Sequence, residues 1–281
     1  ANLKMEKIMI YKIENKKMKI TLKNEIMELP IKLKEENPSE SEKILRVCIS
    51  KGCTDSMVAL GNILSTGTDE QKKESFKLFT EAGNAGNIHG LRNSGYALAL
   101  GIGCSKNKTA AAEWYKRAAE AGHAKAQCNL GVLYSYGNGV SQNDEEAAKW
   151  YKMSAENGYS RGQTNYGEYL MYGRGVKKDA AEAAKWFEAS GSNRALFHLA
   201  ELYLAGDGVP QSRDKAIEFL KSSSDGGYAK AMTFLASLII NEDRVYAESL
   251  YTKAAEKGNQ TAIDALRNLG LPIPCVKKVR N

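Results

Sequence analysis

The chain has 281 residues, of which 43% are hydrophobic and 26% are charged, a composition that suits a soluble, folded protein and excludes a disordered one. Its 40 Lys and Arg residues exceed its 33 Asp and Glu residues by 7, and the surplus is dispersed along the chain. Because there is no Arg-rich run with interleaved aromatic residues, the sequence predicts no nucleic-acid partner, whereas acidic protein partners are compatible with it.

Residues 1–36 come first and match nothing in the sequence that follows. Their apolar positions fit degenerate helices about as well as the local alternation of Met18, Ile20 and Leu22 fits a strand. We expect a helical N-terminal cap, or a junction to further sequence. The Lys- and Glu-rich start has no long apolar core, so it predicts neither a signal peptide nor direct membrane insertion.

Residues 37–270 are predicted to form one tandem array of helical repeats rather than two domains. Glycine recurs there at steps of 34, 36, 36, 33, 36 and 31 residues. The recurring residues are Gly52, Gly86, Gly122, Gly158, Gly191, Gly227 and Gly258. Repetition at this period indicates a solenoid, in which each unit buries its apolar face only against its neighbours.

The clearest repeat, residues 124–158, predicts two helices. Apolar residues at 126, 130, 133 and 134 have the spacing of one helical face and predict a first helix, helix A, over about 124–136. Ala147, Trp150, Tyr151 and Ala155 predict a second helix, helix B, over about 144–157. Each repeat is therefore expected to be a helix-turn-helix unit.

Glycine pairs separate the two helices of several repeats. The pairs are Gly101/Gly103, Gly137/Gly139, Gly173/Gly175 and Gly206/Gly208. A phosphate-binding loop is excluded because no strand precedes them and the same pair returns in successive repeats. The first glycine is expected to end helix A with a positive φ, and the second to allow a tight reversal.

Helix B is predicted to begin at a capping residue. The candidate N-caps are Asn37, Asn107, Asn143, Asp179, Ser212 and Asp243, with Gln71 as the exception. Glu40, Glu146 and Glu182 lie three residues later and predict capping boxes, while Pro38 suits the first helical turn.

Small residues on helix A are predicted to face large residues on helix B. The small residues are Gly61, Gly95, Gly131, Gly167, Ala200 and Ala236. The large ones are Leu78/Phe79, Trp114/Tyr115, Trp150/Tyr151, Trp186/Phe187, Phe219/Leu220 and Leu250/Tyr251. Aromatic residues at helical spacing are typical of a packed core, so we assign them to the core rather than to a cofactor site.

These motifs resemble the Sel1-like repeat, a relative of the tetratricopeptide repeat. Residues 88–227 carry the resemblance most clearly, as in Leu130-Gly131, Tyr134, Gly137-x-Gly139-Val140 and Trp150-Tyr151. It implies an all-α fold, a right-handed αα-superhelix of about six to seven repeats, and the class of adaptor or scaffold proteins in signalling, protein quality control and bacterial–host contact.

The five cysteines bear on an activity once attributed to some secreted members of that family, β-lactam hydrolysis. Those members carry a paired cysteine in each repeat, whereas Cys48, Cys53, Cys104, Cys128 and Cys275 are odd in number and irregular in spacing. We predict free thiols in a reducing compartment, hence a cytoplasmic protein. Hydrolase activity remains only a remote alternative.

Helix A also carries the candidate binding residues, which lie four residues apart on one helix face. They are His89/Asn93, Lys125/Asn129, Arg161/Asn165 and Arg194/His198, and Lys230/Phe234 continues the series. Stacked repeats would arrange them as a ladder of donors, similar to the positions with which tetratricopeptide clamps hold acidic peptides. A structural role stays open, since Asn can bond between repeats and Lys or Arg can be merely solvated.

The sequence therefore predicts a scaffold or adaptor that binds an extended or acidic segment of another protein on the concave face. The alternative is a regulatory subunit or appended module that positions an enzyme. With three histidines, no Gly-x-Ser-x-Gly, no P-loop and no His-Glu-x-x-His, we expect no catalytic residues, no metal and no cofactor. Residues 271–281 are expected to be a basic tail.

Overall fold

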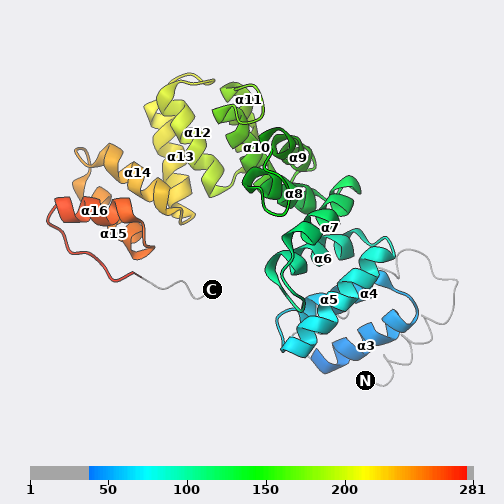
Figure 1. Ribbon diagram of the computed structural model, residues 1–281. Helices are drawn as coiled ribbons and strands as arrows, with labels where there is room; N and C mark the ends of the chain where they lie inside the picture. The colour runs from blue at the N-terminus through cyan, green and yellow to red at the C-terminus, as the bar shows by residue number, and fades with distance from the viewer. Residues whose placement is uncertain (1–37, 277–281) are drawn as a thin grey trace, which may run out of the picture. The chain divides into compact units, whose positions relative to one another are not determined.

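The computed structural model describes residues 38–276, which contain fourteen helices and no strand (Figure 1). The expectations for residues 1–36, for Asn37 and for the basic cluster Lys277, Lys278 and Arg280 fall outside these described residues. The chain forms two compact units, one ending at Gln142 and the other beginning at Asn143. This boundary falls inside a repeat, between its helices A and B, although the repeat motif itself continues through it.

The described helices of the first unit pack in chain order, and α4 also contacts α6. They are α3 Pro38–Ser50, α4 Thr54–Leu64, α5 Asp69–Asn84, α6 Ile88–Leu100, α7 Lys108–Glu120 and α8 Ala124–Tyr136. Helices α4, α6 and α8 are A helices, and α5 and α7 are B helices. The expected helix A of residues 124–136 is thus confirmed with its bounds.

The second unit repeats the arrangement, with α10 in additional contact with α12. Its helices are α9 Asp144–Glu156, α10 Ser160–Tyr172, α11 Ala180–Ser190, α12 Asn193–Ala205, α13 Arg213–Asp225, α14 Ala229–Ile239, α15 Arg244–Glu256 and α16 Gln260–Asn268. The A helices here are α10, α12, α14 and α16. Both units are therefore all-α stacks of helical hairpins, as the repeat predicts.

The predicted caps begin the B helices. The side chains of Asn107, Asn143, Asp179, Ser212 and Asp243 each accept a backbone N–H from the first turn of the helix that follows. The carboxylates of Glu146 and Glu182 do not complete the boxes, because Glu146 pairs with Lys149 at 3.6 Å and Glu182 accepts the indole N–H of Trp186 at 3.2 Å.

Gln71, the exception in the capping series, belongs to a longer helix. Helix α5 begins at Asp69, and Thr68 is its N-cap. The Thr68 hydroxyl accepts the backbone N–H of Gln71, whose side-chain oxygen accepts the backbone N–H of Thr68. This repeat therefore has a complete capping box, three residues earlier than its counterparts.

The small residues of helix A pack against rings from helix B, as predicted. A Cβ at Gly167 would lie 2.6 Å from the ring of Phe187, and one at Gly61 would lie 2.5 Å from the ring of Phe79. Phe187 is fully buried. At these positions a side chain would displace the partner ring, so glycine is required by packing rather than by φ.

The second glycine of each pair has a further role. Gly175 has a φ of 60°, and a Cβ there would lie 2.2 Å from the backbone of Asp144, the first residue of the preceding helix B. Gly103, Gly139 and Gly208 approach the preceding B helix in the same way. The Gly-x-Gly loop therefore packs closely against the B helix of the preceding repeat, in addition to reversing the chain.

All five cysteines are free. Burial raises the pKa of the Cys48 and Cys104 thiols, which keeps both protonated at neutral pH.

Candidate functional site

The candidate binding residues lie on one side of helix A, which we call the A face. In α6, α8, α10 and α12 it comprises a first residue and those four, seven and eleven later, and in α14 the first three of these positions, which 3.6 residues per turn bring onto one side. In the first unit these are His89, Asn93, Tyr96 and Leu100 of α6, and Lys125, Asn129, Val132 and Tyr136 of α8. In the second unit they are Arg161, Asn165, Glu168 and Tyr172 of α10, Arg194, His198, Glu201 and Ala205 of α12, and Lys230, Phe234 and Ser237 of α14.

In the first unit, His89 contacts His123, which caps α8. Nδ1 of His123 accepts the backbone N–H of Ala126, so the ring proton is on Nε2, which donates to Nδ1 of His89 at 3.3 Å. Burial, with the charge of Arg92 adding to it, lowers the pKa of His123 to about 4. His123 is therefore neutral and serves as a cap.

Asn93 is engaged within the protein. It is 8% exposed, its amide donates to Oδ1 of Asn62 at 3.1 Å, and its own Oδ1 accepts from Arg92 at 2.9 Å. Because Asn62 lies on α4, this contact links successive A helices. Asn93 therefore has a structural role, because its side chain bonds between repeats and is buried.

Lys125 and Asn129 of α8 are more accessible to solvent than Asn93. Lys125 is exposed and Asn129 is only half-buried. The first unit therefore presents a solvated ammonium group beside a partly accessible amide, the combination that the predicted groove requires.

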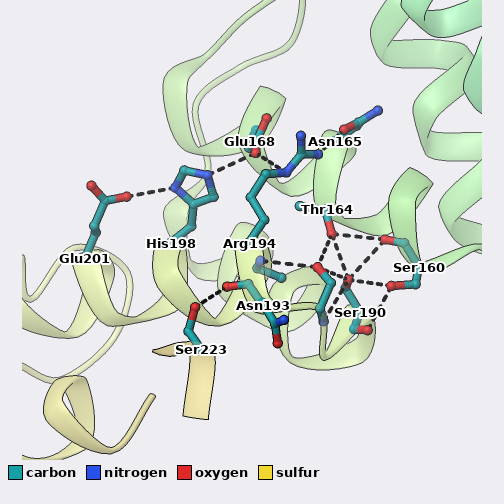
Figure 2. Close-up of polar contacts among 12 residues, drawn as sticks. Ser160, Thr164, Asn165, Glu168, Ser190, Asn193, Arg194, His198, Glu201 and Ser223 are labelled. Carbon is teal, nitrogen blue, oxygen red and sulfur yellow. Dashed lines mark hydrogen bonds and ion pairs between the residues drawn. The ribbon is translucent and has the colours of Figure 1, made fainter. Parts of the chain in front are cut away.

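In the second unit, Arg161 is exposed, whereas Asn165 is 7% exposed and accepts a hydrogen bond from the guanidinium of Arg194. Nε of Arg194 also lies 3.0 Å from Oε1 of Glu168. Arg194 thus joins two residues of α10 to α12, and its charge is already neutralised (Figure 2).

His198 lies between two carboxylates, as Figure 2 shows. Its Nε2 is 2.9 Å from Oε1 of Glu168, and its Nδ1 is 2.7 Å from Oε2 of Glu201. The side chain is only 12% exposed and stacks on Phe187, with ring centroids 5.4 Å apart. Burial by itself favours the neutral ring, but the hydrogen bonds to Glu168 and Glu201 outweigh it and raise the pKa of His198 above its ordinary value.

A hydroxyl cluster lies next to this group, around the turn that joins α11 to α12. Thr164 is 2.7 Å from the hydroxyl of Ser190 and 2.9 Å from that of Ser192, and Ser160 is 2.9 Å from Ser190 (Figure 2). Ser192 caps α12 through the backbone N–H of Ala195. These contacts satisfy the polar groups at the short turn formed by Gly191 and Ser192, so we assign the cluster a structural role.

Sequence reasoning missed Glu168 and Glu201. Both occupy the position directly after the small packing residue, Gly167 or Ala200. In the first unit the equivalent residues are Asn62, Tyr96 and Val132, so no common residue type identifies the position. A helical wheel would have found it, because it lies three residues after the asparagine position and on the same side.

Residues 38–276 were considered as a metal site and as a membrane-spanning chain, and they have the features of neither. No group of three or more His, Cys, Asp or Glu side chains in this range is arranged to hold a metal ion. In the same described range, no helix combines the length and hydropathy needed to cross a membrane.

The fold and the A face define a helical-repeat protein of the solenoid class. The family model of the Sel1 repeat matches residues 54–87, 88–123, 124–159, 160–194, 193–228 and 229–259. The chain therefore belongs to the Sel1 repeat family, whose members generally serve as protein-interaction scaffolds and are typically not catalytic. No curated protein is significantly similar to it in sequence.

Solved structures agree with this assignment. A Sel1 repeat protein from Oxalobacter formigenes is 26% identical, with a TM-score of 0.72, over 82% of this chain and 96% of that one. The protective antigen c5321, present in uropathogenic Escherichia coli strains and displaying an SLR fold, is 23% identical, with a TM-score of 0.54, over 84% of this chain and 61% of that one. The second likeness concerns the fold alone.

Proposed function

We propose that this protein is an interaction scaffold and that the A face of each unit, taken by itself, binds extended, acidic segments of partner proteins. The observation that carries the proposal is the position of the exposed aromatic residues. Tyr96, Tyr136 and Tyr172, at 41%, 72% and 58% exposure, are the exposed aromatic side chains of residues 39–276, and all three belong to the A face. Leu100, at 54%, lies on it as well.

Exposed tyrosines are costly to leave in water and are enriched where proteins bind partners, because a Tyr ring offers a large apolar area together with a polar tip. Their aromatic counterparts on helix B, such as Tyr115 and Tyr151, are 3% exposed. Tyrosines on helix A and helix B thus differ in exposure although they are the same residue type. This difference favours a role of the A face in binding a partner.

The charge of the partner follows from the cations that stay solvated. Lys125 in the first unit and Arg161 and Lys230 in the second are exposed, whereas Arg194 and His198 are paired with carboxylates. We therefore assign capture of acidic side chains to Lys125, Arg161 and Lys230. Asn129 is the amide of the series best placed to meet a peptide backbone, since Asn93 and Asn165 are buried.

The test is selection from a random peptide library displayed on phage, followed by affinity measurements on the enriched peptides. We expect enrichment of Asp or Glu next to aromatic or aliphatic residues. Lys125→Glu and Arg161→Glu, made one at a time, should each weaken binding by about tenfold, which corresponds to about 1.4 kcal/mol.

The matched controls are charge reversals on B helices, Lys73→Glu in the first unit and Lys185→Glu in the second. Both lysines are exposed and lie outside the A face. They should change affinity by less than about twofold, apart from the general effect of net charge at low salt. Enriched peptides without acidic residues, or equal losses in all four variants, would overturn the proposal.

A further inference from the structure

His198 is a charged residue inside a repeat interface, and its hydrogen bonds fix its protonation. Nε2 faces a carboxylate oxygen of Glu168 and Nδ1 faces one of Glu201, at 2.9 and 2.7 Å (Figure 2). An ionised carboxylate can only accept, so both ring nitrogens have to donate. Only the imidazolium ion carries a hydrogen on both nitrogens, and the geometry therefore requires the charged ring.

We infer that His198 is a proton-dependent clamp, which ties α12 to α10 as an imidazolium ion and releases the tie when it loses one proton. The bond to Glu201 stays within α12, whereas the bond to Glu168 crosses to α10. These two A helices are also in direct contact. The clamp thus acts between successive repeats of the second unit.

The surroundings decide which proton is lost. Oε1 of Glu168 is also paired with Nε of Arg194 at 3.0 Å, so this carboxylate keeps a hydrogen-bond donor when His198 becomes neutral. Among the described residues, Glu201 has His198 as its donor. The neutral ring is therefore more stable with its hydrogen on Nδ1, toward Glu201. The lone pair on Nε2 then faces the oxygen of Glu168, which is repulsive, and the inter-helix contact opens.

The groups that face His198 come from each element packed against it. Glu168 and Tyr172 belong to α10, and the ring centroids of Tyr172 and His198 are 6.5 Å apart. Phe187 of α11 stacks on the imidazole. Arg194, Phe197 and Glu201 share its own helix, and the ring of Tyr228, the residue directly before α14, contacts Phe197.

The charges in this cluster sum to zero while the ring is protonated. Arg194 and His198 supply two positive charges, and Glu168 and Glu201 supply two negative charges. Loss of the proton leaves a net charge of −1 on a partly buried cluster, at a cost that solvent relieves only if the side chains separate. A change of one proton is thereby converted into a change of packing.

The first experiment is nitrogen-15 NMR of the histidine rings in the full chain, with His198→Gln used to assign the signals. We expect His198 to show two protonated ring nitrogens at pH 6.5 and to titrate at higher pH than His123. Above its midpoint, Nε2 should take the shift of an unprotonated nitrogen. A single ring N–H at pH 6.5, or loss of the Nδ1 proton first, would overturn the inference.

The second experiment removes each carboxylate by isosteric substitution, Glu168→Gln and Glu201→Gln, with Glu218→Gln as the control. Glu218 is exposed on α13 of the same unit. Both test variants should lower the titration midpoint of His198, and the control should leave it unchanged. Identical midpoints in all three would show that the carboxylates do not hold the proton.

Hydrogen exchange then tests the link between helices. Above the midpoint, amides of α10 and α12 should exchange several-fold faster than below it, after correction for the intrinsic rate, while α15 and α16 stay unchanged. In His198→Gln the pH step should disappear. A step that persists in this variant would assign it to another group. These readouts need no binding partner, so they stand or fall apart from the proposed function.

Discussion

The two units are built from the same repeat, but they place histidine in opposite environments. In the first unit, burial, with the nearby charge of Arg92 adding to it, lowers the pKa of His123 to about 4. In the second, Glu168 and Glu201 hold His198 and its pKa rises. The position after the small packing residue is Tyr96 or Val132 in one unit and Glu168 or Glu201 in the other. The repeat therefore fixes the helices in both units, whereas the side chains around each histidine fix its charge.

The largest loss of stability is expected from substitutions of the packing glycines, which have the same role in both units. Gly95→Leu and Gly167→Leu would each drive a side chain into a buried ring, Tyr115 or Phe187. Because neither ring has space to move, each change should cost about 3 kcal/mol of unfolding free energy, measured by urea denaturation. Similar costs would show that packing is common to both units. A cost below about 1 kcal/mol in either one would show that its core is looser than described.

An intermediate effect is expected from pH, with opposite signs in the two units. The folded pKa of His123 is below its unfolded value of 6.5, so stability should fall as pH drops from 6.5 to about 4. His198 has a raised folded pKa, so the stability that it contributes is complete below its unfolded value and is lost as pH rises through the folded one. After allowance for solvent screening, the acid limb should amount to about 1–2 kcal/mol.

Two substitutions separate these limbs. His123→Asn keeps an N-cap, as Asn87 does for α6, but removes the titrating ring. It should flatten the acid limb of the melting temperature, whereas His198→Gln should flatten only the limb above neutral pH. If His123→Asn flattened both limbs, the assignment of opposite roles to the two histidines would be wrong.

The smallest effect distinguishes the asparagines of the first unit. Asn93→Ala removes contacts to Asn62 and Arg92 inside the protein, so it should cost about 1 kcal/mol of stability. Asn129→Ala, at a half-buried position, should cost less than about 0.5 kcal/mol and should instead weaken binding of the selected peptides. Thermal melts and peptide affinities measure the two effects, and a reversed order would exchange the structural and binding roles of these residues.

Much of the fold could be predicted because its signals are local. N-caps such as Asn143 and Asp179 act within one turn, and Gly167 reports its ring partner through a fixed spacing. The exception in the capping series arises where a helix is shifted against the repeat. Gln71 does not follow the capping series because α5 begins about one turn earlier than the other B helices, after its N-cap Thr68.

The candidate site was predicted only in part. The sequence placed Lys125, Arg161 and Arg194 on one side of helix A, and their positions in the structure agree with that. It treated Arg194 and His198 as available donors, whereas Glu168 and Glu201 occupy them. Asn93 and Asn165 were likewise weighed as groove residues, but both are buried in contacts with the protein.

The sequence by itself determined the repeat, its helices, its caps and the side of helix A that the candidate residues share, because each depends on spacings of a few residues along one chain segment. The tertiary structure decided which polar groups on that side are free. Partners such as Glu168 and His198 are 30 residues apart, and their contact exists only when one repeat stacks on the next. Hydrogen bonding and burial between repeats therefore set the charge state of His198 and leave Lys125 and Arg161 exposed to solvent.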